Sequence, residues 1–299
     1  MKKVLITGAL GQDGRILSRI YIKKKFKVYG IVKKKRFPLI KKVKYFENNL
    51  KIKNRLINII NEVKPDIVVH LASYNETYSK RKKDTYTKNY ESNILISKNL
   101  IDVLVNSRFK CRFIFAGSSL MFGKSKKIAT EKSKFISNEY YGKYKIYVHK
   151  YLEQLQKKGE INFCTAILFN HDSIYRDKKF LIPRIISAFK SNNKKFIQRI
   201  YSLNISGDFS SAEEICLGIY KLSINKKKIS KIILSSGKRF HINEFINDMN
   251  AKYNFKFEKN KRLDKKNKNI LGSNKLAKKV INFKVNDNYL NSLKKIINT

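Results

Sequence analysis

The 299-residue sequence has no tryptophan, only 3 cysteines and only 3 prolines. The cysteines, Cys111, Cys164 and Cys216, stand far apart, which excludes a disulfide framework and leaves no metal-ligand spacing. No stretch of about 18 uncharged apolar residues is present, so no membrane-spanning helix is predicted. The apolar run 4–6 is too short for the core of a signal peptide. We therefore expect a cytoplasmic protein without a metal site or a membrane partner.

Acidic residues are also scarce. Against 67 Lys and Arg stand 22 Asp and Glu, so the formal net charge is +45. Such an excess is typical of proteins that bind nucleic acid or anionic membranes. Here, however, the excess is mostly lysine, is spread over the whole chain and accompanies abundant Asn and Ile, a pattern that compositional drift also produces. We predict no specific nucleic-acid partner, and whether the charge is functional stays open at this point.

Short apolar strands alternate with amphipathic helices through the first half of the chain. The strand patterns cover residues 4–6, 28–32, 66–71, 112–116 and 163–169, and the helix patterns cover 14–24, 54–63, 93–105 and 141–155. Strands that are apolar throughout indicate a parallel sheet covered on both faces. We predict an α/β fold: a Rossmann-type, doubly wound parallel sheet over 1–169 and a smaller C-terminal substrate lobe over 170–299.

The second half is less regular. Its helix patterns cover residues 180–189, 212–222, 242–252 and 289–297, and a strand pattern covers 231–235. The lysine-rich stretch 258–269 is expected to be a surface loop.

A glycine-rich turn follows the first predicted strand and precedes the first predicted helix. It contains Gly8, Gly11 and Gly14. Glycines let the chain turn tightly and let backbone N–H groups approach a pyrophosphate, and the helix N-terminus adds partial positive charge. The strand–turn–helix context is what a dinucleotide site requires. At the end of the second strand, where an acidic residue favours NAD, the chain has Lys33 and Lys34, and cations there favour the 2′-phosphate of NADP.

Two further patterns indicate chemistry at the carboxyl edge of the sheet. Tyr141 and Lys145 are four residues apart at a helix start and project from one face. A nearby ammonium lowers the pKa of a phenol, which can then exchange protons near neutral pH. Ser118 and Ser119 follow a buried strand, where open α/β sheets bind ligands. His70 is expected to be a packed histidine, whereas His171 is as readily a site residue as a packed one.

Taken together, these motifs resemble the extended short-chain dehydrogenase/reductases, and among them most closely the GDP-mannose 4,6-dehydratases. The turn 6–14 is similar to that family's Gly-x-x-Gly-Gln-Asp-Gly, and 168–173 is similar to its Leu-Phe-Asn-His-Glu-Ser. Further similar segments are 29–34, 59–65, 180–185 and 271–277. The resemblance covers nearly the whole chain.

The resemblance implies roles for individual residues. Ser118, Tyr141 and Lys145 would be catalytic. NADP, with NAD the less favoured cofactor, would be bound by Gly8, Gly11, Gln12, Asp13, Gly14, Lys33, Lys34, Leu71, Ala72, Ser73, Tyr141 and Lys145. A nucleotide sugar, expected to be a GDP-hexose, would contact Ser119, Asn170 and Arg184. The family also implies a homodimer or homotetramer.

Two departures from the family pattern bear on the activity. In the dehydratase motif Ser-Thr-Ser-Glu-x-Tyr-Gly, Leu120 replaces the glutamate that takes the C5 proton during elimination. Loss of a positioned acid or base typically costs about 10²–10⁴ in rate. Glu131 and Glu139 are the nearest acidic residues along the chain. The family's diphosphate-binding arginine is replaced by Gly207, for which Arg184, Arg199 or Arg262 are candidate substitutes.

Three functions follow from these patterns. The first is a nucleotide-sugar 4,6-dehydratase, in which hydride leaves C4, water is lost across C5–C6 and the hydride returns at C6. The second is a 4-reductase or epimerase on the same scaffold, for which Leu120 is no obstacle, or a catalytically impaired homologue. The third is a non-enzymatic protein that senses nucleotides or binds polyanions. We favour the dehydratase because the motifs as a whole are most similar to that family.

Overall fold

The computed structural model of the chain describes residues 1–35, 38–74, 87, 90–107, 109–123, 128–255, 269–285 and 288–297. Its larger part is a parallel seven-stranded sheet with the strand order β3-β2-β1-β4-β5-β6-β9. The strands are β1 (Lys3–Thr7), β2 (Lys27–Val32), β3 (Val43–Glu47), β4 (Ile67–His70), β5 (Arg112–Ser118), β6 (Asn162–Leu168) and β9 (Lys231–Leu234). The predicted Rossmann-type parallel sheet is confirmed.

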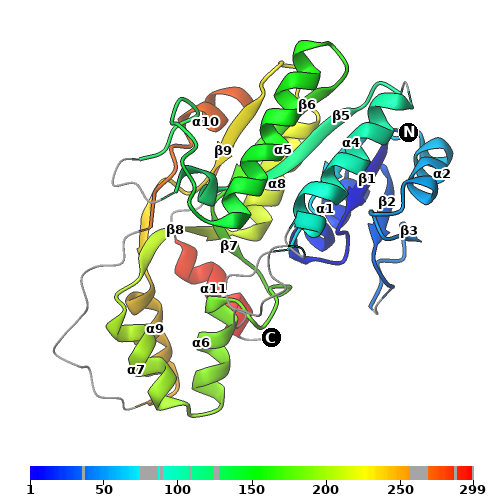
Figure 1. Cartoon of the computed structure of the whole chain (residues 1–299). Helices are drawn as coiled ribbons and strands as arrows, with labels where there is room; N and C mark the ends of the chain where they lie inside the picture. Colours follow the sequence, from blue (N-terminus) through cyan, green and yellow to red (C-terminus); the bar gives the residue numbers. More distant parts are fainter. Residues whose placement is uncertain are drawn as a thin grey trace.

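Helices cover both faces of this sheet (Figure 1). One face is covered by α1 (Gln12–Lys23), α8 (Ala212–Ser223) and α10 (Lys275–Ile281). The other is covered by α2 (Lys53–Val63), α4 (Ile96–Asn106) and α5 (Tyr140–Lys157). Neighbouring residues of β1 show the division, since Ile6 packs with the first set and Leu5 with the second. Burial on both faces explains why these strands are apolar throughout.

A smaller lobe carries a three-stranded sheet in the order β10-β8-β7. These strands are β7 (Asn170–Asp172), β8 (Ser206–Ser211) and β10 (Arg239–His241). Four helices, α6 (Leu181–Lys190), α7 (Lys194–Ser202), α9 (Ile242–Lys252) and α11 (Tyr289–Ile297), contribute to its separate apolar core. In Figure 1 they gather below the large sheet. Within the described residues, no helix is long and apolar enough to span a lipid bilayer.

The chain does not divide cleanly at residue 170. Beyond that point β9 pairs with β6 in the large sheet, and α8 and α10 pack on its face. The chain leaves the Rossmann part near residue 170 and later returns to it. A division at 170 would therefore separate one edge strand and two helices from the large sheet. The division into 1–169 and 170–299 stays a proposal about function and is not a boundary between two separate cores.

Several elements were not predicted from the sequence. β3 is an edge strand with only one buried residue, so its sequence lacks a strong apolar pattern. β7 and β10 have three residues each, too few to show a period. α7 begins with two lysines and buries only Ile197 and Ile200. The helix expected at 93–105 is preceded by a π-helical turn, η1 (Glu91–Leu95), and α4 follows it. The lysine-rich loop expected at 258–269 lies almost entirely outside the described residues.

A buried carboxylate joins the two lobes. Asp208 of β8 accepts hydrogen bonds from the backbone N–H groups of Ser236 (2.7 Å), Gly237 (3.0 Å) and Gly272 (3.2 Å), and from the Ser236 hydroxyl (2.6 Å). Ser236 and Gly237 follow β9 of the large sheet, so this one side chain holds the end of β9 against the small sheet. Asp208 is fully buried, and its four donors would lose their acceptor if it were removed.

We expect Asp208→Ala to lower the free energy of unfolding by about 3 kcal/mol, because buried donors left without an acceptor are costly. The measurement is urea denaturation followed by circular dichroism. Asp177→Ala is the matched control: its carboxylate is 57% exposed and pairs with Lys179, so the change should stay below about 1 kcal/mol. Equal effects of the two substitutions would contradict the role assigned to Asp208.

Candidate active site

The glycine turn between β1 and α1 has the backbone geometry that the sequence predicted. Gly8 has a φ of +71°, and a Cβ on it would lie 3.1 Å from the backbone nitrogen of Ala72. A Cβ on Gly14 would lie 2.4 Å from the Gly8 carbonyl oxygen, so only glycine allows α1 to start this close to the turn. Gly11 is the N-cap of α1. The first N–H groups of the helix have no partners within it and are available to an anion.

Side chains of the first turn of α1 bind β7 of the small lobe. The Gln12 amide donates to the His171 carbonyl (3.2 Å) and accepts from the Ser173 backbone (2.9 Å). Both carboxylate oxygens of Asp13 lie 3.1 Å from His171 Nε2. The Gln12 and Asp13 side chains, predicted to line the cofactor, are thus engaged with the protein, which leaves their backbone N–H groups for a ligand.

This arrangement favours the charged form of His171. Its Nδ1 lies 2.6 Å from the Phe169 carbonyl oxygen, so both ring nitrogens face acceptors, and only the imidazolium can donate to both. Burial lowers the pKa of His171, but the Asp13 carboxylate more than offsets burial and the net pKa is raised. Burial likewise raises the pKa of Asp13, and the charge and hydrogen bond of His171 bring it below its ordinary value.

The segment after β4 borders the glycine turn, as expected for Leu71, Ala72 and Ser73. Ala72 donates its backbone N–H to the Thr7 hydroxyl (3.2 Å), and that hydroxyl lies 2.7 Å from His70 Nδ1. His70 is fully buried and its other nitrogen lies 2.9 Å from the Ser97 hydroxyl. Burial lowers the pKa of His70 to about 3, so the ring is neutral and structural, which confirms the prediction of a packed histidine.

Tyr141 and Lys145 lie on the first turns of α5, and Lys145 is buried while Tyr141 is half-buried. The Tyr141 hydroxyl lies 3.5 Å from the Ser73 hydroxyl. Lys145 Nζ lies 4.8 Å from the centre of the Phe115 ring and 5.4 Å from the centre of the Tyr141 ring. The ammonium therefore sits over aromatic faces and not beside the phenol oxygen. The pair shares one helical face, as the four-residue spacing predicted.

Burial changes the protonation chemistry expected from this pair. We predicted that the Lys145 ammonium lowers the pKa of Tyr141. Instead, burial raises the pKa of Tyr141, opposed by the Ser73 hydroxyl and the Arg176 guanidinium. Burial also lowers the pKa of Lys145 to about 7. Both shifts have the same cause, because a low-dielectric surrounding disfavours the charged form of either group.

Ser118 and Leu120 lie next to the start of α5. Ser118 ends β5 and caps a short 3₁₀ turn, η2 (Ser119–Phe122), its hydroxyl accepting from the Leu120 N–H (3.2 Å). A Cβ on Gly142 would lie 2.6 Å from the Leu120 carbonyl oxygen, so η2 packs directly on the turn that carries Tyr141. The Leu120 backbone thus lies against the turn that carries Tyr141. Ser119 is half-buried in the same turn.

Glu131 and Glu139 are the acidic residues nearest to Leu120 along the chain. No contact between described residues holds the carboxylate of either one at the position of Leu120. The Glu131 carboxylate accepts from the backbone N–H of Ile233, which belongs to β9 (3.0 Å). Glu139 is exposed and precedes α5 as its N-cap residue without a side-chain cap bond.

Lys33 and Lys34 are exposed at the carboxyl end of β2, beside the glycine turn. Gly8 donates its N–H to the Ile31 carbonyl of the same strand (3.0 Å), which keeps the two segments together. Glu47, at the end of the neighbouring β3, accepts a hydrogen bond from the backbone of Lys35. One carboxylate thus lies near these lysines, a feature that the sequence pattern did not reveal.

The predicted substrate residues are spread over the small lobe. Asn170 is exposed at the start of β7 and donates its amide to the Asp208 carbonyl (3.0 Å). The Arg184 guanidinium lies 4.8 Å from the centre of the Phe196 ring, between α6 and α7. Arg199 is exposed on α7, and Arg262 lies outside the described residues.

Two arginines near these residues were missed by the sequence analysis. Arg176 lies 3.3 Å from the Asp172 carboxylate and 3.7 Å from the centre of the Phe180 ring, and its charge acts on Tyr141 and Asp13. Arg239 lies opposite Asp208, one residue from Gly207, and donates to the Ser206 hydroxyl and the Asn269 carbonyl (both 3.2 Å). Only its proximity to the segment 168–173 could have pointed to Arg176. Arg239 is brought to Gly207 by strand pairing, which has no local signal.

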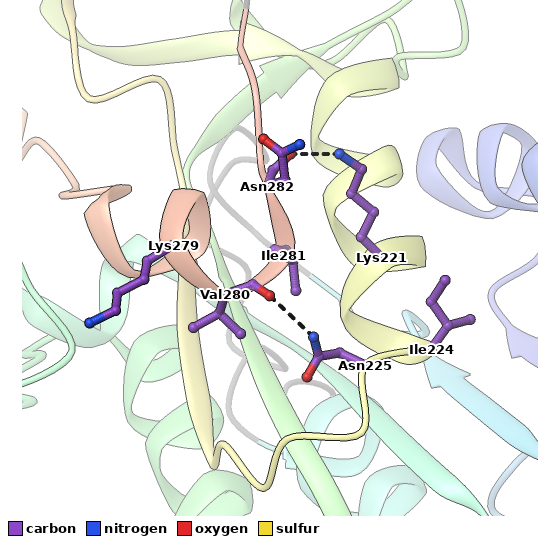
Figure 2. A pocket seen from close by; sticks show the side chains of 7 residues that line it. All are labelled: Lys221, Ile224, Asn225, Lys279, Val280, Ile281 and Asn282. Atoms are coloured by element: carbon purple, nitrogen blue, oxygen red, sulfur yellow. Dashed lines mark hydrogen bonds between the residues drawn. The ribbon is translucent and has the colours of Figure 1, made fainter.

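Two surface grooves are formed by described residues, and Arg239 lines the second of them. Figure 2 shows one of about 480 Å³ between the ends of α8 and α10, where Lys221 donates to the Asn282 carbonyl (2.6 Å) and Asn225 to the Val280 carbonyl (3.2 Å). A second, of about 220 Å³, is lined by aromatic and charged residues around Phe209 and Tyr289. Neither contains a predicted site residue. Within the described parts of the chain, no group of three or more His, Cys, Asp or Glu could hold a metal ion.

Comparison with known proteins places this geometry in a family. Residues 5–292 match the family model described as GDP-mannose 4,6 dehydratase. The chain belongs to the GDP-mannose 4,6-dehydratase family. It is 24% identical over 267 residues to GDP-mannose 4,6 dehydratase 2 of Caenorhabditis elegans, covering 82% of this chain and 69% of that protein. It is 24% identical over 268 residues to the human GDP-mannose 4,6 dehydratase, covering 81% and 70%. The resemblance to the extended short-chain dehydrogenase/reductases is confirmed.

Solved structures of epimerases share the fold of this dehydratase-family chain. The UDP-glucuronic acid 4-epimerase of Bacillus cereus, in complex with UDP-glucuronic acid and NAD, superposes with a TM-score of 0.83 at 16% identity, covering 99% of this chain and 98% of that one. The UDP-glucose 4-epimerase of Thermus thermophilus, in complex with NAD, gives 0.81 at 14% identity with the same coverage. At these identities the likeness concerns the fold.

The lowered pKa of Lys145 predicts how stability of the ligand-free protein depends on pH. Because the folded pKa is about 7 and the ordinary value 10.5, the folded state penalises the ammonium fully below pH 7, and the penalty fades as pH rises to 10.5. Lys145→Met should therefore raise the free energy of unfolding by roughly 4 kcal/mol at pH 7, and the gain should shrink toward pH 10.5.

The measurement is urea denaturation of the ligand-free protein at a series of pH values. Lys143→Met is the control, because Lys143 is an exposed lysine on the same helix. A gain that does not depend on pH would show that Lys145 is not desolvated as described.

Proposed function

We propose that this chain is a nucleotide-sugar-modifying enzyme that oxidises C4 of a GDP-activated hexose with NADP. One observation carries the proposal: the hydroxyl of Tyr141 lies 3.5 Å from that of Ser73, and Ser73 adjoins Ala72, whose backbone packs against Gly8 of the glycine turn. The acid–base group is thereby brought to the end of the turn that suits a dinucleotide. Membership of the dehydratase family supports the same class of substrate.

The residues of the turn fit a nicotinamide dinucleotide. Gly8 and Gly14 keep the backbone close-packed where a Cβ would collide, and the start of α1 presents N–H groups and partial positive charge to a pyrophosphate. Exposed Lys33 and Lys34 suit the 2′-phosphate, which supports NADP over NAD. Such a cofactor, when bound, supplies the chemistry of accepting and returning a hydride.

The chain's own residues handle the proton. Burial keeps Tyr141 protonated, which equips it to donate a proton to a C4 carbonyl in the reducing direction. In the oxidising direction the phenolate must form first, and the Arg176 guanidinium supports it by lowering the pKa of Tyr141. Lys145, whose Nζ lies 5.4 Å from the centre of the Tyr141 ring, is proposed to add to this support when it is protonated. Ser118, at the carboxyl end of β5, is proposed to donate to the same sugar oxygen.

Recognition of the diphosphate is assigned to the small lobe. Asn170 is exposed at the start of β7, which pairs with β8. Strand pairing brings Arg239 to the other side of β8, and Arg176 follows β7 in the chain, while Gly207 leaves no side chain of its own. Ser119 and Arg184 stay proposals as substrate contacts. A homodimer or homotetramer in the cytoplasm is the proposed state, as in the resemblance from which it was inferred.

Loss of water is the step that divides the two candidate activities. The family supports a complete 4,6-dehydratase. Leu120 supports a 4-reductase or epimerase, because leucine cannot take the C5 proton and because Glu131 is bound to β9. We propose that this chain oxidises C4 and that elimination of water is slow because Leu120 cannot take the C5 proton.

The decisive experiment incubates the protein with NADP⁺ and GDP-mannose and follows the sugar nucleotide by mass and NADPH by absorbance. We expect oxidation at C4, seen as formation of NADPH, and little loss of water from the sugar nucleotide. Tyr141→Phe should lower turnover at least 10³-fold, on the order of a lost acid–base group, and leave NADP binding by fluorescence within about twofold. Unchanged turnover in Tyr141→Phe would remove this residue from the mechanism.

Leu120→Glu tests the elimination step. A carboxylate beside the turn that carries Tyr141 should raise the rate of water loss from GDP-mannose by about 10-fold or more, because it restores a base at that position. Leu120→Gln is the matched control: its side chain has the size and polarity of Glu without the basicity. Equal rates in both variants would favour the reductase or epimerase activity.

A further inference from the structure

Among the residues that the structure describes, Ser73 is the side chain whose hydroxyl is within reach of the Tyr141 phenol oxygen. The two oxygens are 3.5 Å apart, and either can donate. Lys145 does not take this position, because its ammonium lies over the face of the Tyr141 ring, 5.4 Å from the ring centre. Ser118 has another partner, since its oxygen accepts from the Leu120 N–H.

We propose that Ser73 is a positioning residue for the reaction: its hydroxyl donates to the Tyr141 oxygen when the phenolate forms and holds that oxygen toward the sugar. This inference rests on the proposed function, in which Tyr141 exchanges a proton with the C4 oxygen. It divides the work between two serines, with Ser118 directed to the sugar oxygen and Ser73 to the phenol oxygen.

The backbone that carries Ser73 is held in place by a buried series of hydrogen bonds. The Ala72 N–H donates to the Thr7 hydroxyl, which also meets His70 Nδ1, while His70 Nε2 meets the Ser97 hydroxyl. Because His70 is fully buried and neutral, this series does not change with pH in the working range. Ser73 thus follows directly after a backbone segment that buried hydrogen bonds hold, the kind of support that keeps a reacting group in place.

The charges around Tyr141 explain why a hydroxyl donor from Ser73 would help the phenolate to form. Burial raises the pKa of the phenol and Asp13 adds to that, so a phenolate needs donors. Besides the Arg176 guanidinium, the Ser73 hydroxyl is the group that lowers the pKa. A hydroxyl donor bonds the charged phenolate more strongly than the neutral phenol and so favours the charged form. Removing it should therefore make the phenolate harder to form and should leave binding of the sugar nearly unchanged.

The test compares Ser73→Ala and Ser73→Thr with wild type. Ser73→Ala should lower kcat for oxidation at C4 by about 10-fold and change KM less than twofold. Because this direction needs the phenolate, the ascending limb on the acidic side of the pH profile should move upward by about one unit. Ser73→Thr keeps the hydroxyl and should restore kcat to within about threefold. Ser191→Ala, an exposed serine after α6, is the control for handling and folding.

A second measurement does not depend on turnover. The ultraviolet difference between the protein and its Tyr141→Phe variant, recorded against pH, reports ionisation of Tyr141 alone. In the Ser73→Ala background this titration should move upward. An unmoved titration overturns the inference, as does a loss of kcat that Ser73→Thr does not restore. If no sugar nucleotide is turned over but the titration moves, the proposed function fails and the role of Ser73 at the phenol stands.

Discussion

The attachment of α1 to β7 is the contact on which the site depends. Gln12 and Asp13, on the first turn of α1, hold the His171 and Ser173 segment through hydrogen bonds and an ion pair. That turn presents the N–H groups suited to a pyrophosphate, and β7 begins with Asn170, the proposed diphosphate contact. The large sheet and the small lobe are thus joined where cofactor and substrate are proposed to meet, so their relative position is set by buried polar contacts rather than by a flexible hinge.

The contact between α1 and β7 pairs two buried ionisable side chains, His171 and Asp13. His171 donates from both ring nitrogens, to a backbone carbonyl and to Asp13, which only its charged form can do. A buried imidazolium and a buried carboxylate each need the other, because either alone would carry the full cost of desolvation. Asp208 meets the same demand differently, through four donors from neighbouring segments and no cation among them. At both contacts, a buried charged side chain is bonded by groups from both lobes.

Desolvation also governs the protonation of Tyr141 and Lys145, the proposed catalytic pair. Tyr141 and Lys145 are each pushed toward neutrality, the phenol upward in pKa and the lysine downward to about 7. A site in this state is ready to donate a proton and needs added positive charge or hydroxyl donors to accept one. The Leu120 backbone packs on the turn that carries Tyr141, and leucine offers no carboxylate at this position. Family membership therefore indicates which substrate class to test. The residues around Tyr141 indicate which step, proton exchange at C4 or elimination of water, the site is suited to perform.

The sequence by itself determined the parallel sheet, the glycine turn and the shared helical face of Tyr141 and Lys145, because each follows from local spacing: apolar runs for buried strands, glycines where a Cβ would collide, and four residues for one helical turn. It also predicts that Leu120 replaces the elimination glutamate, since Leu120 stands in a segment that resembles the family's motif. Only the tertiary structure decided that Ser73 faces the Tyr141 hydroxyl, that Arg239 lies beside Gly207, and that β9 returns to the large sheet. These are contacts between residues tens of positions or more apart in the chain. Their distances, and the desolvation that reverses the expected pKa of Tyr141, come from packing that no local pattern encodes.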